Sequence, residues 1–175
     1  MRIDRIGGGV AAYSSLGILL LAAACGGPSS REEAEKLMNA GLPLARRAVV
    51  EGREMTPFAF LMTTKGEMRP FIPTEESPGP ASQQGIDSLV RSLREGAKGG
   101  SYRAIAIYAQ VRIEPPSGGG MTEAIEVMLE HRGGYCVNAF FPYTRGEEGS
   151  LDFAGFFAAP RPGAVFSSCN ESGLR

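Results

Sequence analysis

The stretch Val127–Tyr143, VMLEHRGGYCVNAFFPY, holds two apolar segments separated by Gly133 and Gly134. Apolar and polar residues alternate through the first segment, which is typical of a strand with one buried face. A Gly-Gly pair between two strands favours a tight two-residue turn, and such a turn joins antiparallel neighbours. The stretch therefore predicts a β-hairpin.

Segments on both sides of this hairpin extend the same pattern. In chain order we expect a helix from Arg31 to Gly52, strands at Pro57–Thr63 and Met68–Ile72, a helix ending at Lys98, and strands at Tyr102–Ile113, Ala124–Arg132, Tyr135–Tyr143 and Leu151–Ala159. Because the connections between the strands are short, the sheet should be antiparallel. The prediction is an α+β fold of about five to six strands, with both helices packed on one face.

Composition limits the classes of partner. The chain has 175 residues, 43% of them hydrophobic and 21% charged, with a net charge of -1. No cluster of Lys and Arg with interleaved aromatic residues is present in the sequence, so we expect no nucleic-acid partner. The length fits one domain, expected at 31–175 with a loop-rich C-terminal tail, preceded by an N-terminal extension.

The extension has the pattern of an export signal. Arg2 and Arg5 precede a short apolar segment, Val10–Leu21, and three alanines follow at 22–24. A helix that spans a bilayer needs about 20 apolar residues, and this segment is shorter. The pattern therefore favours a signal peptide over a retained membrane helix.

The segment Leu21-Ala22-Ala23-Ala24-Cys25 resembles the lipobox of bacterial lipoproteins, although that family prefers Leu where this chain has Ala22. The resemblance implies that residues 1–24 are a signal peptide, that the sulfur of Cys25 carries a diacylglycerol, and that 25–30 are a short tether. It places the protein in the bacterial cell envelope. Gly26 is not the Asp that favours inner-membrane retention in enteric lipoproteins, which favours the outer membrane, facing the periplasm. The inner membrane, and an ordinary Cys25 behind a soluble export signal, are the alternatives.

Assigning Cys25 to lipid leaves Cys136 and Cys169 as a pair. Exported proteins meet an oxidising compartment, so we expect a disulfide between them. Buried or free structural thiols are the alternative, and a third hypothesis is catalytic. A two-residue turn at Gly133-Gly134 would place His131 directly opposite Cys136, and a neighbouring His is how thiolate nucleophiles are activated.

Few other residues suggest chemistry. Glu126 and Glu130 alternate with apolar neighbours and are expected on a solvated strand face, so we predict no metal site, no cofactor and no assigned catalytic residue. The stretch Val127–Tyr143 also resembles segments of small uncharacterised bacterial α+β proteins, a resemblance that implies no activity.

The predicted function is therefore a lipid-anchored cell-envelope protein with a non-catalytic binding or structural domain. Its expected partners are the membrane, through the lipid on Cys25, and another envelope protein. The alternatives are a sensor-like module with a small-ligand pocket between sheet and helices, and a Cys–His thiol enzyme.

Overall fold

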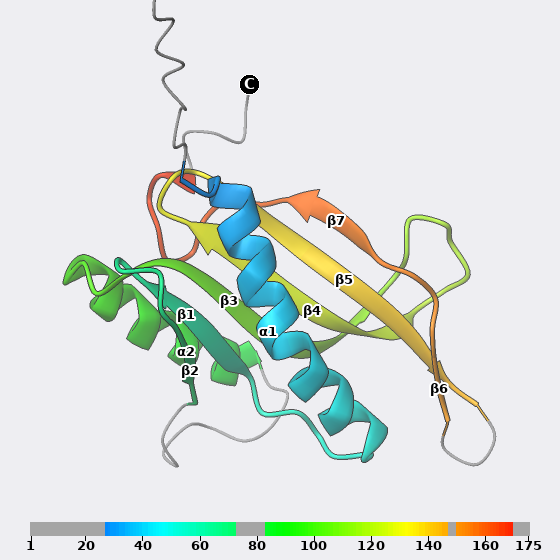
Figure 1. The fold of residues 1–175 in the computed structure, drawn as a ribbon. Coiled ribbons are helices and arrows are strands. Elements are labelled where there is room, and N and C mark those ends of the chain that lie inside the picture. Colours follow the sequence, from blue (N-terminus) through cyan, green and yellow to red (C-terminus); the bar gives the residue numbers. More distant parts are fainter. Residues whose placement is uncertain (1–26, 73–82, 147–149, 170–175) are drawn as a thin grey trace, which may run out of the picture.

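One antiparallel sheet organises the chain, as the sequence predicts. The computed structural model describes residues 27–72, 83–146 and 150–169. Its elements are α1 (Ser30–Val50), β1 (Phe58–Thr63), β2 (Met68–Phe71), α2 (Gln83–Lys98), β3 (Tyr102–Ile113), β4 (Thr122–His131), β5 (Cys136–Arg145), β6 (Leu151–Phe153) and β7 (Phe157–Pro160). The sheet order is β2-β1-β3-β4-β5-β6, and β7 pairs with β5 on the same edge as β6 (Figure 1). The predicted α+β class is confirmed.

Within the described residues the sheet has seven strands, because the segment expected as one strand, Leu151–Ala159, forms two. β6 pairs with the end of β5 and β7 pairs with its beginning. Between them Gly155 has a φ of 80°, a left-handed conformation that breaks a strand and that glycine adopts readily.

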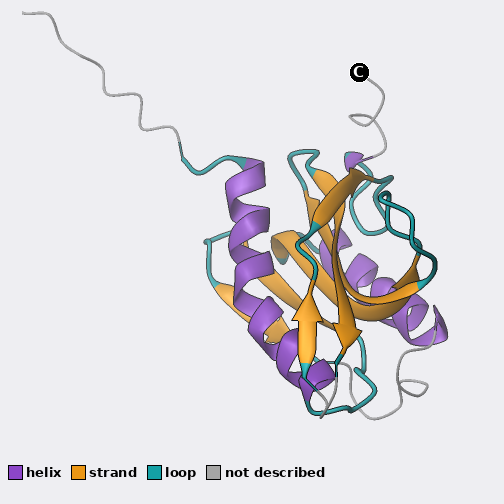
Figure 2. Ribbon diagram, turned by 90° about the vertical axis from the view of Figure 1, so that its right-hand side faces the viewer, coloured by secondary structure: helices purple, strands orange, loops and turns teal. Residues whose placement is uncertain are grey.

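The two helices pack on opposite faces of the sheet, whereas the sequence predicts both on one face (Figure 2). The reason lies in β3, whose residues from 104 to 109, AIAIYA, are all buried. Ala104, Ala106 and Tyr108 face α1, while the alternate residues Ile105 and Ile107 face α2. A strand that is apolar on both sides needs a layer on each face.

Helix α1 begins with a capping box, one residue earlier than expected. Ser29 is the N-cap: its hydroxyl accepts from the Glu32 N–H at 3.2 Å, and the Ser29 N–H donates to the Glu32 carboxylate at 2.7 Å. Further along, the hydroxyl of Tyr108 on β3 donates to the carbonyl oxygens of Leu37 and Met38, at 2.6 and 3.0 Å. These bonds fix the position of α1 against the sheet.

Candidate functional site

The structure describes the predicted disulfide but not the predicted lipidation site. Cys25 and the predicted export signal before it lie outside the described residues, and no described helix is long and apolar enough to cross a membrane. Cys136 and Cys169 are brought together in a disulfide, with their Cα atoms 5.7 Å apart. Both are buried on the α2 side of the sheet, so the bond fastens the tail after β7 to the start of β5.

The turn between β4 and β5 contains three residues, Arg132, Gly133 and Gly134, whereas the sequence predicts two. The N–H of His131 donates to the carbonyl oxygen of Tyr135 at 2.9 Å, and the N–H of Gly134 donates to that of His131 at 2.9 Å. Gly134 has a φ of 89°. Three-residue hairpin loops typically end with a residue in this left-handed conformation.

The extra loop residue shifts the hairpin register by one position, so Cys136 pairs with Glu130. A shift of one residue turns every side chain of the second strand to the other face of the sheet. His131 consequently faces α1, whereas Cys136 faces α2. The predicted reactive pair of His131 and Cys136 is therefore wrong, because the two side chains lie on opposite sides of the sheet.

His131 instead joins a buried charged cluster with Glu33 of α1 and Arg103 of β3. Its Nε2 lies 3.0 Å from Glu33 Oε2, and Arg103 Nε donates to the same oxygen at 2.7 Å. The second Glu33 oxygen accepts from Arg103 Nη2. The N–H of Gly133 donates to His131 Nδ1 at 2.8 Å, so Nδ1 is an acceptor and Nε2 carries the proton that bonds Glu33.

This arrangement keeps Glu33 ionised. Burial of the carboxylate acts to raise its pKa, but the hydrogen bonds and positive charge of Arg103, with the hydrogen bond from His131, outweigh burial and hold that pKa below its ordinary value. The sequence does carry a signal for this site, although Glu33 is absent from the residues predicted above. Glu33 lies four residues before the buried Leu37, which places a carboxylate on the buried face of α1.

A second carboxylate, Glu130 of β4, is fully buried on the α2 side. It accepts from Arg161 Nη1 at 2.9 Å and from the N–H groups of Ala164, Val165 and Phe166 at 2.7, 2.8 and 3.0 Å. The expectation of a solvated face is thus wrong at Glu130, because the segment after β7 covers that part of the sheet. The carboxylate occupies a concave group of backbone donors that would otherwise suit an anion.

Glu126, the neighbouring carboxylate on that face, is half-buried. It accepts from Asn138 Nδ2 at 2.6 Å. Burial raises its pKa, opposed by the charge of Arg161. Among the described residues, no group of three or more His, Cys, Asp or Glu side chains gathers as metal ligands would.

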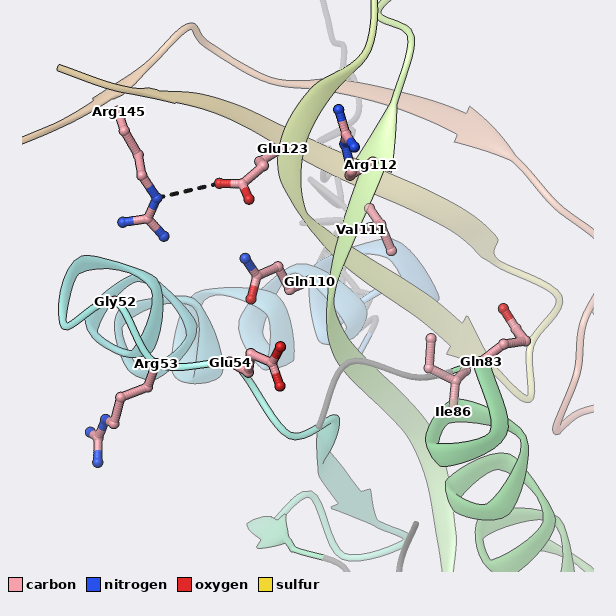
Figure 3. A pocket seen from close by; sticks show the side chains of 10 residues that line it. All are labelled: Gly52, Arg53, Glu54, Gln83, Ile86, Gln110, Val111, Arg112, Glu123 and Arg145. Atoms are coloured by element: carbon pink, nitrogen blue, oxygen red, sulfur yellow. Dashed lines mark ion pairs between the residues drawn. The ribbon is translucent and has the colours of Figure 1, made fainter. Parts of the chain in front are cut away.

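One hollow among the described residues is a groove where the segment after α1, the start of α2 and the ends of β3, β4 and β5 meet (Figure 3). Its volume is about 620 Å³, and it adjoins a second hollow of about 420 Å³. The two share Arg112 of β3, Glu123 of β4 and Arg145 of β5. The groove is also lined by the segment after α1, by the first turns of α2 and by β3, namely Gly52, Arg53, Glu54, Gln83, Ile86, Gln110 and Val111.

Charged and amide groups dominate this groove. Arg145 Nε lies 3.5 Å from Glu123 Oε2, with both side chains about 40% exposed. Gln110 Nε2 donates to the Tyr143 hydroxyl at 2.8 Å, and burial, with the charge of Glu123, raises the pKa of Tyr143 to about 12. The Arg112 side chain has no hydrogen-bond or ion-pair partner among the described residues. The groove thus offers guanidinium and amide donors to a polar ligand.

Comparisons with known proteins add no relative. No family model, no curated protein and no solved structure matches the chain.

Proposed function

We propose that the protein is a lipid-anchored domain of the bacterial cell envelope that binds another envelope component without catalysis, through the groove of Figure 3. One observation carries this proposal: the groove lies beside a strand edge that no described strand pairs with. The last pair between β1 and β3 joins Phe58 to Tyr108, yet β3 continues to Ile113. Beyond Tyr108, β3 has a ladder partner only on β4 among the described strands.

An extended peptide segment suits this geometry. A partner chain can add to an exposed strand edge through main-chain hydrogen bonds, while side-chain groups beside the edge select its sequence. Here Gln110 and Arg112 lie on the strand with the free edge, and Arg145 lies across β4 on β5, where it lines the same groove. Arginine forms paired hydrogen bonds with carboxylates, so a segment that carries Asp or Glu is the expected partner.

The predicted anchor would also determine how the groove faces relative to the membrane. The tether before α1 spans less than about 20 Å when extended, so lipidated Cys25 would hold Ser30 close to the bilayer. The 21 residues of α1 rise about 30 Å, and Gly52 at its far end lines the groove. An anchored domain would therefore present the groove away from the membrane that holds it.

Two variants test the proposal separately. Cys25→Ser should release or mislocalise the protein in membrane fractionation, and unchanged fractionation would refute the lipid anchor.

Arg112→Glu reverses a charge in the groove and should abolish recovery of a partner that the parent chain captures from solubilised native envelope. Lys98→Glu, an exposed charge reversal outside the groove, serves as the control and should retain the partner. Equal recovery by Arg112→Glu and the parent would overturn the groove assignment.

A small polar ligand is the second candidate, favoured by the groove volume of about 620 Å³. Pockets of 300–1,000 Å³ commonly hold small molecules. A rise in melting temperature on addition of a dicarboxylic acid, absent in Arg112→Glu, would favour a small ligand over a protein partner.

A further inference from the structure

We infer that the domain has a second contact surface, which binds the anionic lipid headgroups of the membrane that carries the anchor. The surface consists of two adjoining hollows of about 350 and 390 Å³ between the end of α2 and the segment after β7. This inference rests on the proposed anchor and assigns a role to the end of the molecule opposite the groove. The charged residues of the surface are Arg94, Lys98 and Arg132.

The surface lies beside the start of α1. Gly133 is so close to Ser30 that a Cβ atom at Gly133 would overlap the Ser30 hydroxyl. Arg132 precedes that glycine, and its Nη2 donates to the Ala97 carbonyl oxygen at 3.1 Å, which joins the β4–β5 turn to the end of α2. Because Ser30 follows a short tether, a lipid on Cys25 would bring Arg132 and the end of α2 to the headgroup region.

Among the described residues, the two arginines of this surface are held by neutral groups. Arg94 Nε and Nη2 both donate to the carbonyl oxygen of Ala164, at 2.9 and 2.6 Å. Arg132 lies 5.9 Å from the centre of the Phe166 ring. A guanidinium has five N–H donors, so each arginine retains donors that can point to a phosphate. These contacts orient both arginines without neutralising them.

The nearby carboxylate does not cancel the charge. Lys98 Nζ lies 2.9 Å from Glu95 Oε1, with both side chains about two-thirds exposed. Such exposed pairs hold their partners weakly. The four side chains carry a net positive charge, and each basic group near an anionic bilayer strengthens attachment within about 10 Å of its surface. An anionic phospholipid headgroup is therefore the occupant that fits the surface.

Vesicle flotation tests the inference. The full chain carrying Cys25→Ser, which no lipid modifies, is mixed with phosphatidylcholine vesicles with or without phosphatidylglycerol. Adding Lys98→Glu should weaken binding to the phosphatidylglycerol vesicles at least about fivefold and leave binding to phosphatidylcholine unchanged. Arg112→Glu makes a similar charge reversal in the groove and should behave as the unsubstituted chain. The N-terminal segment is common to all of these chains, so its own affinity cancels.

Two outcomes would overturn the inference: unchanged binding by Lys98→Glu, or equal losses by both variants, which would indicate only diffuse attraction by net charge. Far-ultraviolet circular dichroism and an intact disulfide would show that Lys98→Glu is folded. This assay involves neither lipidation nor a protein partner, so its failure would not bear on the proposed anchor or groove. Unchanged membrane fractionation of Cys25→Ser would refute the lipid anchor, but it would not alter the result of the vesicle assay.

Discussion

Two buried carboxylates, Glu33 and Glu130, hold together segments that lie far apart in the sequence. Each is bonded on both oxygens, the first by side chains and the second by an arginine and three backbone N–H groups. The sequence alone predicts a solvated Glu130 because this residue alternates with apolar neighbours along its strand. Nothing in that alternation shows that the tail returns to cover the same face.

Glu130→Gln should lower the free energy of unfolding by about 3 kcal/mol or more. The amide removes the charge that balances the mostly buried Arg161 and turns N–H donors toward backbone donors. Urea unfolding measures the loss. Glu67→Gln is the matched control, because Glu67 pairs with Arg69 on the surface and should cost less than about 1 kcal/mol. Equal losses in the two variants would contradict the buried role.

Low pH should lower the free energy of unfolding, in part because Glu33 becomes protonated. Its folded-state pKa is below the ordinary value, so its stabilising contribution is present above the unfolded-state pKa of about 4.3 and is lost as the pH falls toward the folded pKa. Glu33→Gln should therefore flatten the fall in unfolding free energy below about pH 4.5. Urea titrations at a series of pH values compare the two slopes, and identical slopes would exclude Glu33 as a source.

At the scale of elements, the sequence predicts the strands well and their relative positions less well. The hairpin of β4 and β5 is found where Gly133-Gly134 places it, but the turn includes Arg132 and the register moves by one. The stretch AIAIYA in β3 indicates that helices cover both faces, since its alanines are as buried as its isoleucines. Because larger side chains alternate with alanines in this stretch, the pattern by itself predicts only one apolar face.

The packing of α1 on β3 depends on a missing side chain. An ideal Cβ at Gly41 would lie 2.4 Å from Cζ of Tyr108, inside the space of the ring. Gly41→Ala should therefore destabilise the fold by about 1–3 kcal/mol, although alanine is the better helix former. Thermal or urea unfolding measures the change. Asn39→Ala, at an exposed position of the same helix, should be neutral or slightly stabilising.

At the scale of the whole molecule, the sequence indicates which cysteines meet but not how the groove forms. The groove is built where the segment after α1, the first turns of α2 and the ends of β3, β4 and β5 come together, and no local pattern links these segments. Within any single strand, the polar residues of the groove form no recognisable motif. Only the tertiary arrangement places Arg112, Glu123 and Arg145 around one hollow.

Reduction of the disulfide should lower the free energy of unfolding by about 3–4 kcal/mol, since the bond closes a loop between cysteines 33 positions apart. Urea unfolding of the Cys25→Ser chain with and without reductant measures the difference. In the same oxidised chain, a thiol reagent should label no cysteine after unfolding. Uptake of the reagent by Cys136 would show that this thiol is free and would contradict the bond.

We expect Glu130 to influence which thiols meet while the chain oxidises. Three cysteines allow three different pairings. By binding the N–H groups of Ala164, Val165 and Phe166, the carboxylate holds Cys169 beside Cys136, the cross-strand neighbour of Glu130. The resulting high local concentration favours the native bond over mispairing with Cys25. If Cys25 carries the proposed lipid, a carboxylate that takes no part in sulfur chemistry would thereby help to keep that thiol available for it.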